Sequence, residues 1–211
     1  MQIKLKDLGH YSGAVDGVLG NKSLDAIAKL LPSGESPSFI STDPLVWGSR
    51  VSEAFRMRVR LMARLNHWDA NDLMTVMAFE SGGTFSASVK NAAGSGAVGL
   101  IQFMPATARA MGTTTEALAA LSPVSQLDYV ERYLAPFKTR LKTLSDLYMA
   151  ILWPAAVGQP EDYVLFRADK GMTKAYFQNR GLDVNKDLKI TKGEAAALVL
   201  ARKKQGEAFK A

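Results

Sequence analysis

Glu80 is the residue whose type and position most clearly indicate chemistry. Leu73, Val76 and Met77 follow the spacing of one helix face, and Glu80 falls on that face at the i+7 position. A carboxylate on an apolar stripe is unusual, because removing its charge from water is costly. Residues 81–83 (Ser-Gly-Gly) end the predicted helix, and the helix dipole disfavours an anion there. Both effects raise the expected pKa, and a carboxyl that stays protonated near neutral pH can be the general acid of glycoside cleavage.

The spacing alone leaves an alternative, in which Glu80 is a helix-end acid paired with one of the many arginines. The residues that follow favour catalysis. Glu80-Ser81 precedes the segment Gly99-Leu100-Ile101-Gln102-Phe103-Met104-Pro105, and Thr107-Ala108 come next. Together these motifs resemble the catalytic signature of lytic transglycosylases. These are the goose-lysozyme-like enzymes of glycoside hydrolase family 23, which include phage endolysins.

The resemblance implies an all-α, lysozyme-like (goose-type, SLT) catalytic domain in which Glu80 is the catalytic acid and Gln102 contacts the substrate. It also makes Ser81, Gly99 and Phe103 candidate substrate-binding residues. The third motif of the family is a helix that contains Ala-Tyr-Asn. Its nearest match here is Leu147-Tyr148-Met149-Ala150, so Tyr148 is a further candidate, with Met149 in place of the asparagine.

Composition excludes several other chemistries. Hydrophobic residues make up 47% of the 211 residues, which is enough for a substantial core. There is no cysteine, so disulfides, a thiolate nucleophile and thiolate metal sites are excluded. The two histidines, His10 and His67, do not form a ligand-spaced pair, which argues against a zinc amidase or peptidase. We therefore expect no cofactor and no catalytic metal.

The ends and the charge of the chain predict where it acts. The N-terminal residues have no long apolar region, so no signal peptide is expected, and no run is apolar enough to cross a bilayer. A wall enzyme made in the host cytoplasm would then reach the periplasm after release by lysis, or within a virion. The net charge of +6 suits the anionic bacterial wall. No nucleic acid is expected as a partner, because no basic run with interleaved aromatics is present.

A short N-terminal segment, residues 1–36, is predicted to be separate from the catalytic domain, residues 37–211. Its signature, Leu8-Gly9, Tyr11, Gly13, Asp16-Gly17 and Gly20, is similar to the second half of a three-helix peptidoglycan-binding module. The resemblance makes Tyr11, Asp16 and Gly17 candidate wall-binding residues. The alternative is an ordinary helical extension. Residues 32–38, rich in Pro, Ser and Gly, are expected to be a linker.

Helix-capping residues and prolines predict where the helices that position these residues begin. Ser52 should begin a helix to about Asn66, and Asp69, with Asp72 at the third helical position, should begin the helix that carries Glu80. Further helix starts are expected at Pro105, Thr113, Ser122-Pro123 and Ser145. Residues 82–99 are expected to form a loop or small hairpin over the cleft. Arg56, Arg60 and Arg64 share one helix face, interpreted as solvated, with wall adhesion as the alternative.

Residues 183–194 have the ligand spacing of an EF-hand calcium loop, with Asp183, Asn185, Asp187, Thr191 and Glu194 at the ligand positions. The sixth position requires a sharp turn with positive φ and is usually glycine, whereas this chain has Leu188. In the other interpretation, Thr191 and Glu194 form a capping box for the C-terminal helix. We expect no tight calcium binding here, although weak binding stays possible.

The sequence as a whole predicts a monomeric phage endolysin that cleaves the β-1,4 bond between N-acetylmuramic acid and N-acetylglucosamine of peptidoglycan. Glycosidases commonly use two carboxylates, but no second acid here has comparable motif support. The resemblance suggests instead that the substrate's acetamido group assists, giving a 1,6-anhydro product. A hydrolysing muramidase with the same site, and a non-catalytic wall-binding virion protein, remain the alternatives.

Overall fold

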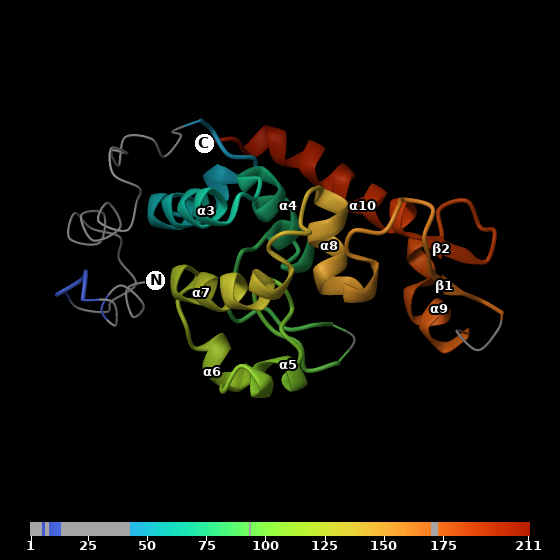
Figure 1. Ribbon diagram of the computed structural model, residues 1–211, viewed down its shortest axis with the longest axis horizontal. Coiled ribbons are helices and arrows are strands. Elements are labelled where there is room, and N and C mark those ends of the chain that lie inside the picture. The colour runs from blue at the N-terminus through green and yellow to red at the C-terminus, as the bar shows by residue number, and fades with distance from the viewer. Residues whose placement is uncertain (1–5, 7–8, 14–42, 93, 170–172) are drawn as a thin grey trace.

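The computed structural model describes residues 6, 9–13, 43–92, 94–169 and 173–211, which form a helical body and a smaller lobe (Figure 1). The body contains most of the α-helices, and the lobe contains one short α-helix and a two-stranded sheet. The α-helices are α3 (Glu53–Asn66), α4 (Ala70–Glu80), α5 (Pro105–Ala110), α6 (Thr115–Ala119), α7 (Pro123–Leu134), α8 (Leu144–Leu152), α9 (Thr173–Asn179) and α10 (Lys192–Gly206). The 3-10 helices are η2 (Gly48–Arg50), η3 (Ala135–Phe137), η4 (Pro154–Ala156), η5 (Arg180–Leu182) and η6 (Glu207–Phe209). The strands are β1 (Val164–Arg167) and β2 (Lys189–Thr191).

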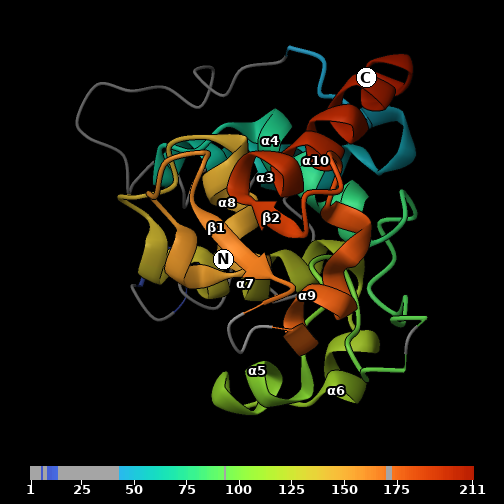
Figure 2. The same ribbon diagram turned by 90° about the vertical axis from the view of Figure 1, so that its right-hand side faces the viewer.

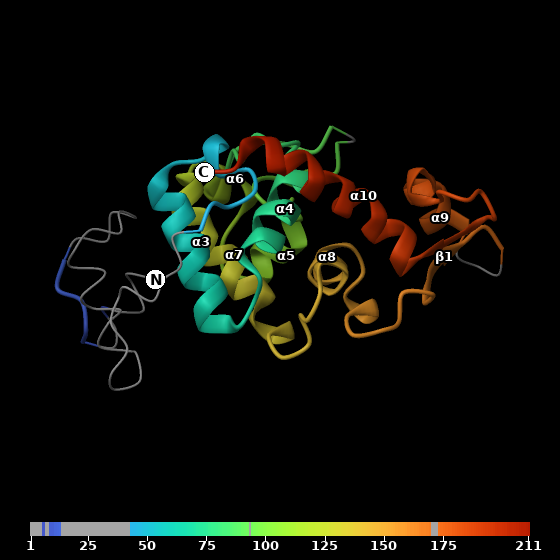
Figure 3. The same cartoon turned by 90° about the horizontal axis from the view of Figure 1, so that it is seen from above.

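The helix α4 lies at the centre of the body. Residues 73–78 of α4 are all buried, because α3, α8 and α10 each pack against it. A helix that is apolar around most of its circumference must be enclosed in this way. The long helix α10 runs along α4 and α8 and continues to the lobe of α9, β1 and β2 (Figure 3). The short helices α5 and α6 lie on the side of the body opposite α10 (Figures 1 and 2). Among the described residues, no helix is long and apolar enough to span a membrane.

The helix starts show which sequence predictions were right. The side chains of Ser52, Asp69 and Ser122 each accept a hydrogen bond from a backbone N–H three residues later, as N-caps do. Two predicted starts are wrong by one or two positions, because neighbouring threonines take the role. The Thr114 hydroxyl, rather than that of Thr113, caps α6, and the Thr143 hydroxyl, rather than that of Ser145, caps α8.

The predictions missed the sheet. Strands β1 and β2 pair antiparallel, with Phe166 opposite Ile190, and a register irregularity separates Val164 from Phe166. Strands of three and four residues carry almost no alternation pattern, and the pairing joins segments that are distant in the sequence. Their pairing joins β1 to β2, which directly precedes α10 along the chain.

The sixth position of the loop at 183–194 adopts a positive φ although the residue there is a leucine. Leu188 has φ +65°, so the leucine does not prevent the conformation that this position requires, and its N–H donates to the Asp183 carboxylate at 3.1 Å. Internal bonds engage the carboxylates: Asp183 also accepts from the Tyr176 hydroxyl at 2.7 Å. The predicted capping box between Thr191 and Glu194 is present in both directions. Within the described residues, no group of three potential ligands is arranged to hold a metal ion.

The N-terminal segment is only partly described. Asp16, Gly17 and the predicted linker at 32–38 lie outside the described residues, so the prediction of a separate segment at 1–36 stays a prediction. The Tyr11 side chain is buried, at 8% exposure. From Asp43 the chain enters the body, where Leu45 exchanges two backbone hydrogen bonds with Ala211, so the two ends of the stretch 43–211 lie together.

Candidate active site

Glu80 is the last residue of α4, and its carboxyl is partly buried. Burial raises the pKa of Glu80 to about 7, because the charged form loses hydration that no neighbour replaces. Among the described residues, no hydrogen bond or ion pair engages this carboxyl. The alternative of a helix-end acid paired with arginine therefore finds no support in the structure. The geometry provides a carboxyl that is neutral in a large share of molecules at neutral pH.

Two tyrosines lie beside Glu80. Tyr148 of α8 is 3% exposed and meets Phe79 edge to face, with 5.3 Å between ring centroids. Tyr133 of α7 donates its hydroxyl hydrogen bond to the carbonyl of Ala150 at 2.7 Å. The pKa of each phenol is raised, first by burial and second by the negative charge of Glu80. Both phenols therefore stay neutral and act as O–H groups next to the acid.

Ser81 fixes the chain that leaves Glu80. Its side chain is buried at 1% exposure, donates to the Met77 carbonyl at 2.6 Å and accepts from the Phe85 N–H at 3.0 Å. The structure thus places the Ser81 hydroxyl inside the turn, where it has little surface to offer a ligand. The sequence analysis had named Ser81 as a candidate substrate-binding residue. We propose instead that Ser81 orients Glu80 and the following glycines and does not contact the substrate.

A tight turn at residues 98–103 forms the second part of the site. Val98 and Phe103 exchange two backbone hydrogen bonds, of 2.8 and 3.1 Å, and the turn between them needs positive φ at Gly99 (+82°) and Gln102 (+52°). A glutamine in this conformation is strained, and such strain gathers at functional sites. The Gln102 amide nitrogen donates to the carbonyls of Gly99 at 3.1 Å and Val89 at 3.3 Å. The amide donors therefore stabilise the turn, while the side-chain carbonyl oxygen remains available as an acceptor.

Gln126 of α7 supports this turn through hydrogen bonds from its side chain. The sequence analysis did not identify Gln126. Its side chain is fully buried; its carbonyl oxygen accepts from the Leu100 N–H at 2.8 Å, and its nitrogen donates to the carbonyls of Ala87 and Leu118. A Cβ added at Gly99 would collide with the Gln126 amide, so residue 99 must be glycine. Gly99 is thus required for close packing. Phe103 is 2% exposed and packs edge to face on Tyr133, which makes it a core residue below the site.

Three other acids of the body are held by cations. Arg58, at 1% exposure, bonds Asp128 at 2.8 Å and Glu131 at 2.6 Å, and Lys192 bonds Asp146 at 2.6 Å. Burial works against ionisation of Asp128 and Asp146, but their cationic partners still leave both pKa values lowered. Asp128 and Asp146 are therefore ionised structural groups, unlike Glu80, whose pKa is raised.

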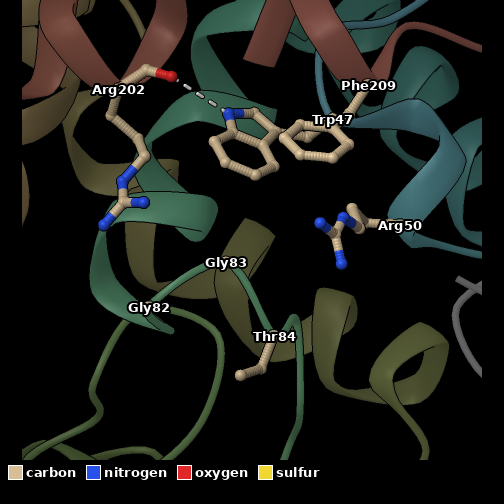
Figure 4. Close-up of a pocket in the computed structure, with 7 residues that line it drawn as sticks. All are labelled: Trp47, Arg50, Gly82, Gly83, Thr84, Arg202 and Phe209. Carbon is tan, nitrogen blue, oxygen red and sulfur yellow. Dashed lines mark hydrogen bonds between the residues drawn. The ribbon is translucent and has the colours of Figure 1, made fainter. Parts of the chain in front are cut away.

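A surface groove of about 430 Å³ borders the turn that follows Glu80. Gly82, Gly83 and Thr84 form one wall, and Trp47, Arg50, Arg202 and Phe209 form the other (Figure 4). The sequence analysis did not identify this groove, because its walls come from three segments that are distant in the sequence, at residues 47–50, 82–84 and 202–209. Only the glycines after Glu80 pointed to this region.

Comparison with known families adds to the geometry. Residues 60–152 match the family described as Transglycosylase SLT domain. This region is a lysozyme-like transglycosylase domain. The family comprises lytic transglycosylases that act on peptidoglycan, so the chain is an enzyme of the peptidoglycan lytic transglycosylase type. No curated protein was found to match the chain.

The transglycosylase domain contains Glu80, the turn at 98–103, Tyr133 and Tyr148, but not the candidate wall-binding residues near the N-terminus. The all-α, lysozyme-like fold predicted from the sequence is confirmed. At the third motif, Met149 replaces the expected asparagine and is fully buried, so this position supplies no polar group to the site. The phenol of Tyr148 is then the polar group that α8 brings next to Glu80.

Proposed function

We propose that this transglycosylase is a phage endolysin that cleaves the β-1,4 bond between N-acetylmuramic acid and N-acetylglucosamine and releases a 1,6-anhydro product. One observation carries the proposal: the partly buried Glu80, with a pKa of about 7, lies beside two neutral phenols. Such a carboxyl can give a proton and then take one back at neutral pH, which is what both halves of the reaction need.

In the first half, the Glu80 carboxyl donates its proton to the glycosidic oxygen. The bond between this oxygen and C1 of the muramyl residue breaks, and its electron pair leaves with the N-acetylglucosamine. The acetamido oxygen of the muramyl residue forms a bond to C1 and takes up the positive charge. Glu80 becomes anionic in this step. The Tyr148 hydroxyl is the nearby dipole that can stabilise the new charge, because the Tyr133 hydroxyl already donates its hydrogen to the Ala150 carbonyl.

In the second half, the Glu80 carboxylate removes the proton from the muramyl 6-hydroxyl. The 6-oxygen forms a bond to C1 and the acetamido oxygen leaves, which closes the 1,6-anhydro ring and restores neutral Glu80. The binding of Asp128, Glu131 and Asp146 in ion pairs supports this route, because none of them is free to activate a water as a second carboxylate would. The Gln102 carbonyl oxygen would accept a hydrogen bond from the substrate.

Mass spectrometry of a digest of purified peptidoglycan tests this proposal. The expected product is anhydro-muropeptide. Reducing muropeptides would instead establish a muramidase, with water replacing the 6-hydroxyl. Absence of any product from folded protein would favour a non-catalytic, wall-binding virion component. Activity should also fall as the pH rises above about 7, because the acid form of Glu80 is then depleted.

The proposed setting is the wall of a phage-infected bacterium. The net charge of +6 supports attraction to the anionic wall, and residues 1–36, with Tyr11, Asp16 and Gly17, would hold the enzyme on its polymer. We propose that the protein is monomeric and reaches the periplasm after release. Loss of wall retention on deletion of this segment, discussed below, is the corresponding test.

A further inference from the structure

The groove beside the catalytic turn carries an inference beyond cleavage itself. Two of its seven lining residues, Arg50 and Arg202, are cationic, and none is acidic. Figure 4 shows the two guanidinium groups on either side of the Trp47 and Phe209 rings, with Gly82–Thr84 facing them. The groove is therefore a cationic site with a fixed back wall.

The back wall is rigid because Trp47 is fixed from several directions. Its backbone has φ +64°, its N–H donates to the Gly206 carbonyl at 3.1 Å, and its indole nitrogen donates to the Arg202 carbonyl at 3.2 Å. The indole stacks on Phe209 with 4.9 Å between ring centroids and 16° between planes. A Cβ added at Gly206 would collide with the indole, so the C-terminal end of α10 is fitted to this ring.

The aromatic rings hold the arginines and do not offer a platform for sugars. The Arg50 guanidinium lies 4.1 Å from the centroid of the Phe209 ring, and that of Arg202 lies 5.7 Å from the centroid of the Trp47 ring. Stacking of this kind restrains a guanidinium while leaving its N–H groups free to bind an anion. Trp47 is only 5% exposed, so it has little free surface for a pyranose ring.

The charge of the groove is not neutralised by neighbouring acids. In the described part of the chain, no ion pair reaches Arg50 or Arg202, and the Arg202 side chain bonds the neutral amide of Gln205 at 3.2 Å. Glu207, the acid of η6, is engaged by Lys210 at 2.6 Å. Two restrained guanidiniums without a counter-charge are suited to a carboxylate, which each can bind through two N–H groups.

We propose that this groove is a subsite that binds a carboxylate of the peptide stem of peptidoglycan while Glu80 acts on the glycan. The inference rests on the proposed function and names a second part of the same polymer. A volume of about 430 Å³ is within the range of small-ligand sites and can admit a short peptide. Along the backbone, Gly82 can lie no more than about 8 Å from Glu80 and Thr84 no more than about 15 Å. One segment of substrate can therefore reach both sites.

The test compares glycan strands that carry peptide stems with the same strands after the stems are removed. The variants are Arg50→Gln, Arg202→Gln and the double change. Replacing the Arg202 side chain keeps the hydrogen bond from Trp47, because the indole donates to the Arg202 backbone carbonyl. The matched control is Arg140→Gln, which removes an exposed arginine stacked on Phe137 outside the groove.

The double variant should lose about tenfold or more in kcat/KM on stem-bearing strands and less than twofold on stripped strands, while Arg140→Gln changes neither. Equal losses on both strands, or no loss on either, would overturn the subsite and leave the cleavage reaction standing. Failure of the proposed function itself would look different, since the wild-type protein would then cleave neither strand.

Calorimetry with soluble stem tetrapeptide does not depend on turnover. It distinguishes binding of a stem carboxylate from binding of a teichoic-acid phosphate. The tetrapeptide with free carboxylates should bind the wild-type protein at least tenfold more tightly than the fully amidated tetrapeptide does. The double variant should lose this preference. Glycerol phosphate serves as a mimic of teichoic acid. If it bound more tightly than the stem peptide, or if amidation had no effect, the assignment to a peptide carboxylate would be wrong.

Discussion

Replacing Glu80 with glutamine should stabilise the folded protein at high pH and leave its stability almost unchanged at low pH. The pKa of Glu80 is raised from an ordinary 4.5 to about 7 because its carboxyl is buried. Between these two values the folded state keeps a proton that the unfolded chain has lost, so stability falls as the pH rises from about 4.5 to about 7. Glutamine is neutral throughout and removes this dependence.

The size of the effect follows from the same two values. The difference between about 7 and 4.5 corresponds to about 3 kcal/mol of unfolding free energy at pH 8 and above. This is an upper value, since the partly buried carboxylate keeps some hydration when it ionises. For a chain of this size, about 3 kcal/mol raises Tm by about 6–12 °C.

Urea denaturation followed by circular dichroism at pH 4 to 9 measures the effect. The difference between Glu80→Gln and the wild-type protein should be near zero at pH 4 and should grow until about pH 7 to 8. Glu161→Gln is the matched control, because it makes the same change from carboxyl to amide at an exposed position. A difference that is constant with pH, or one that titrates near 4.5, would refute the assignment of Glu80 as a buried neutral acid.

Four other changes probe separate parts of the molecule. Gly99→Ala should cost about 1–3 kcal/mol more than Gly112→Ala in chemical denaturation, because both glycines have positive φ but only a Cβ at residue 99 meets another side chain; equal costs would contradict the close packing. Lys192→Met leaves a buried carboxylate without its cation and should cost about 3–5 kcal/mol at neutral pH, a loss that should shrink at pH 3; a loss under 1 kcal/mol would show that the pair is dispensable. Calorimetry should detect no micromolar calcium binding at residues 183–194, and a large fall in Tm with chelator would show otherwise. Deletion of residues 1–36 should weaken sedimentation with insoluble wall more than turnover on soluble fragments, and unchanged sedimentation would reject a binding role.

The sequence predicted most reliably what depends on local chemistry. Ser52 and Asp69 began helices as expected, because a capping side chain acts only three residues away. The position of Glu80 on an apolar stripe likewise predicted its raised pKa, since the stripe and the helix end are both visible in the sequence. The Gly99–Gln102 segment was named as part of the candidate site, but its turn and its internal hydrogen bonds were not predicted.

The features that were missed depend on tertiary neighbours. Gln126 and Tyr133 support the turn and the acid, but on α7 they look like ordinary members of an amphipathic helix. Arg58 was overlooked in favour of Arg56, Arg60 and Arg64, although it lies three residues after Phe55 on the apolar face, and that spacing could have identified it as a buried cation. The sequence also cannot show that the C-terminal end of α10 would meet Trp47 and build a groove there.

The turnover of Glu80→Gln on purified peptidoglycan tests the central claim most directly. Mass-spectrometric counting of released muropeptides gives the rate, and unchanged or increased thermal stability shows that the variant is folded. Loss of the general acid should lower turnover by at least about 100-fold. A folded Glu80→Gln protein that releases muropeptides within a few-fold of the wild-type rate would contradict the account, because the proton would then come from another group.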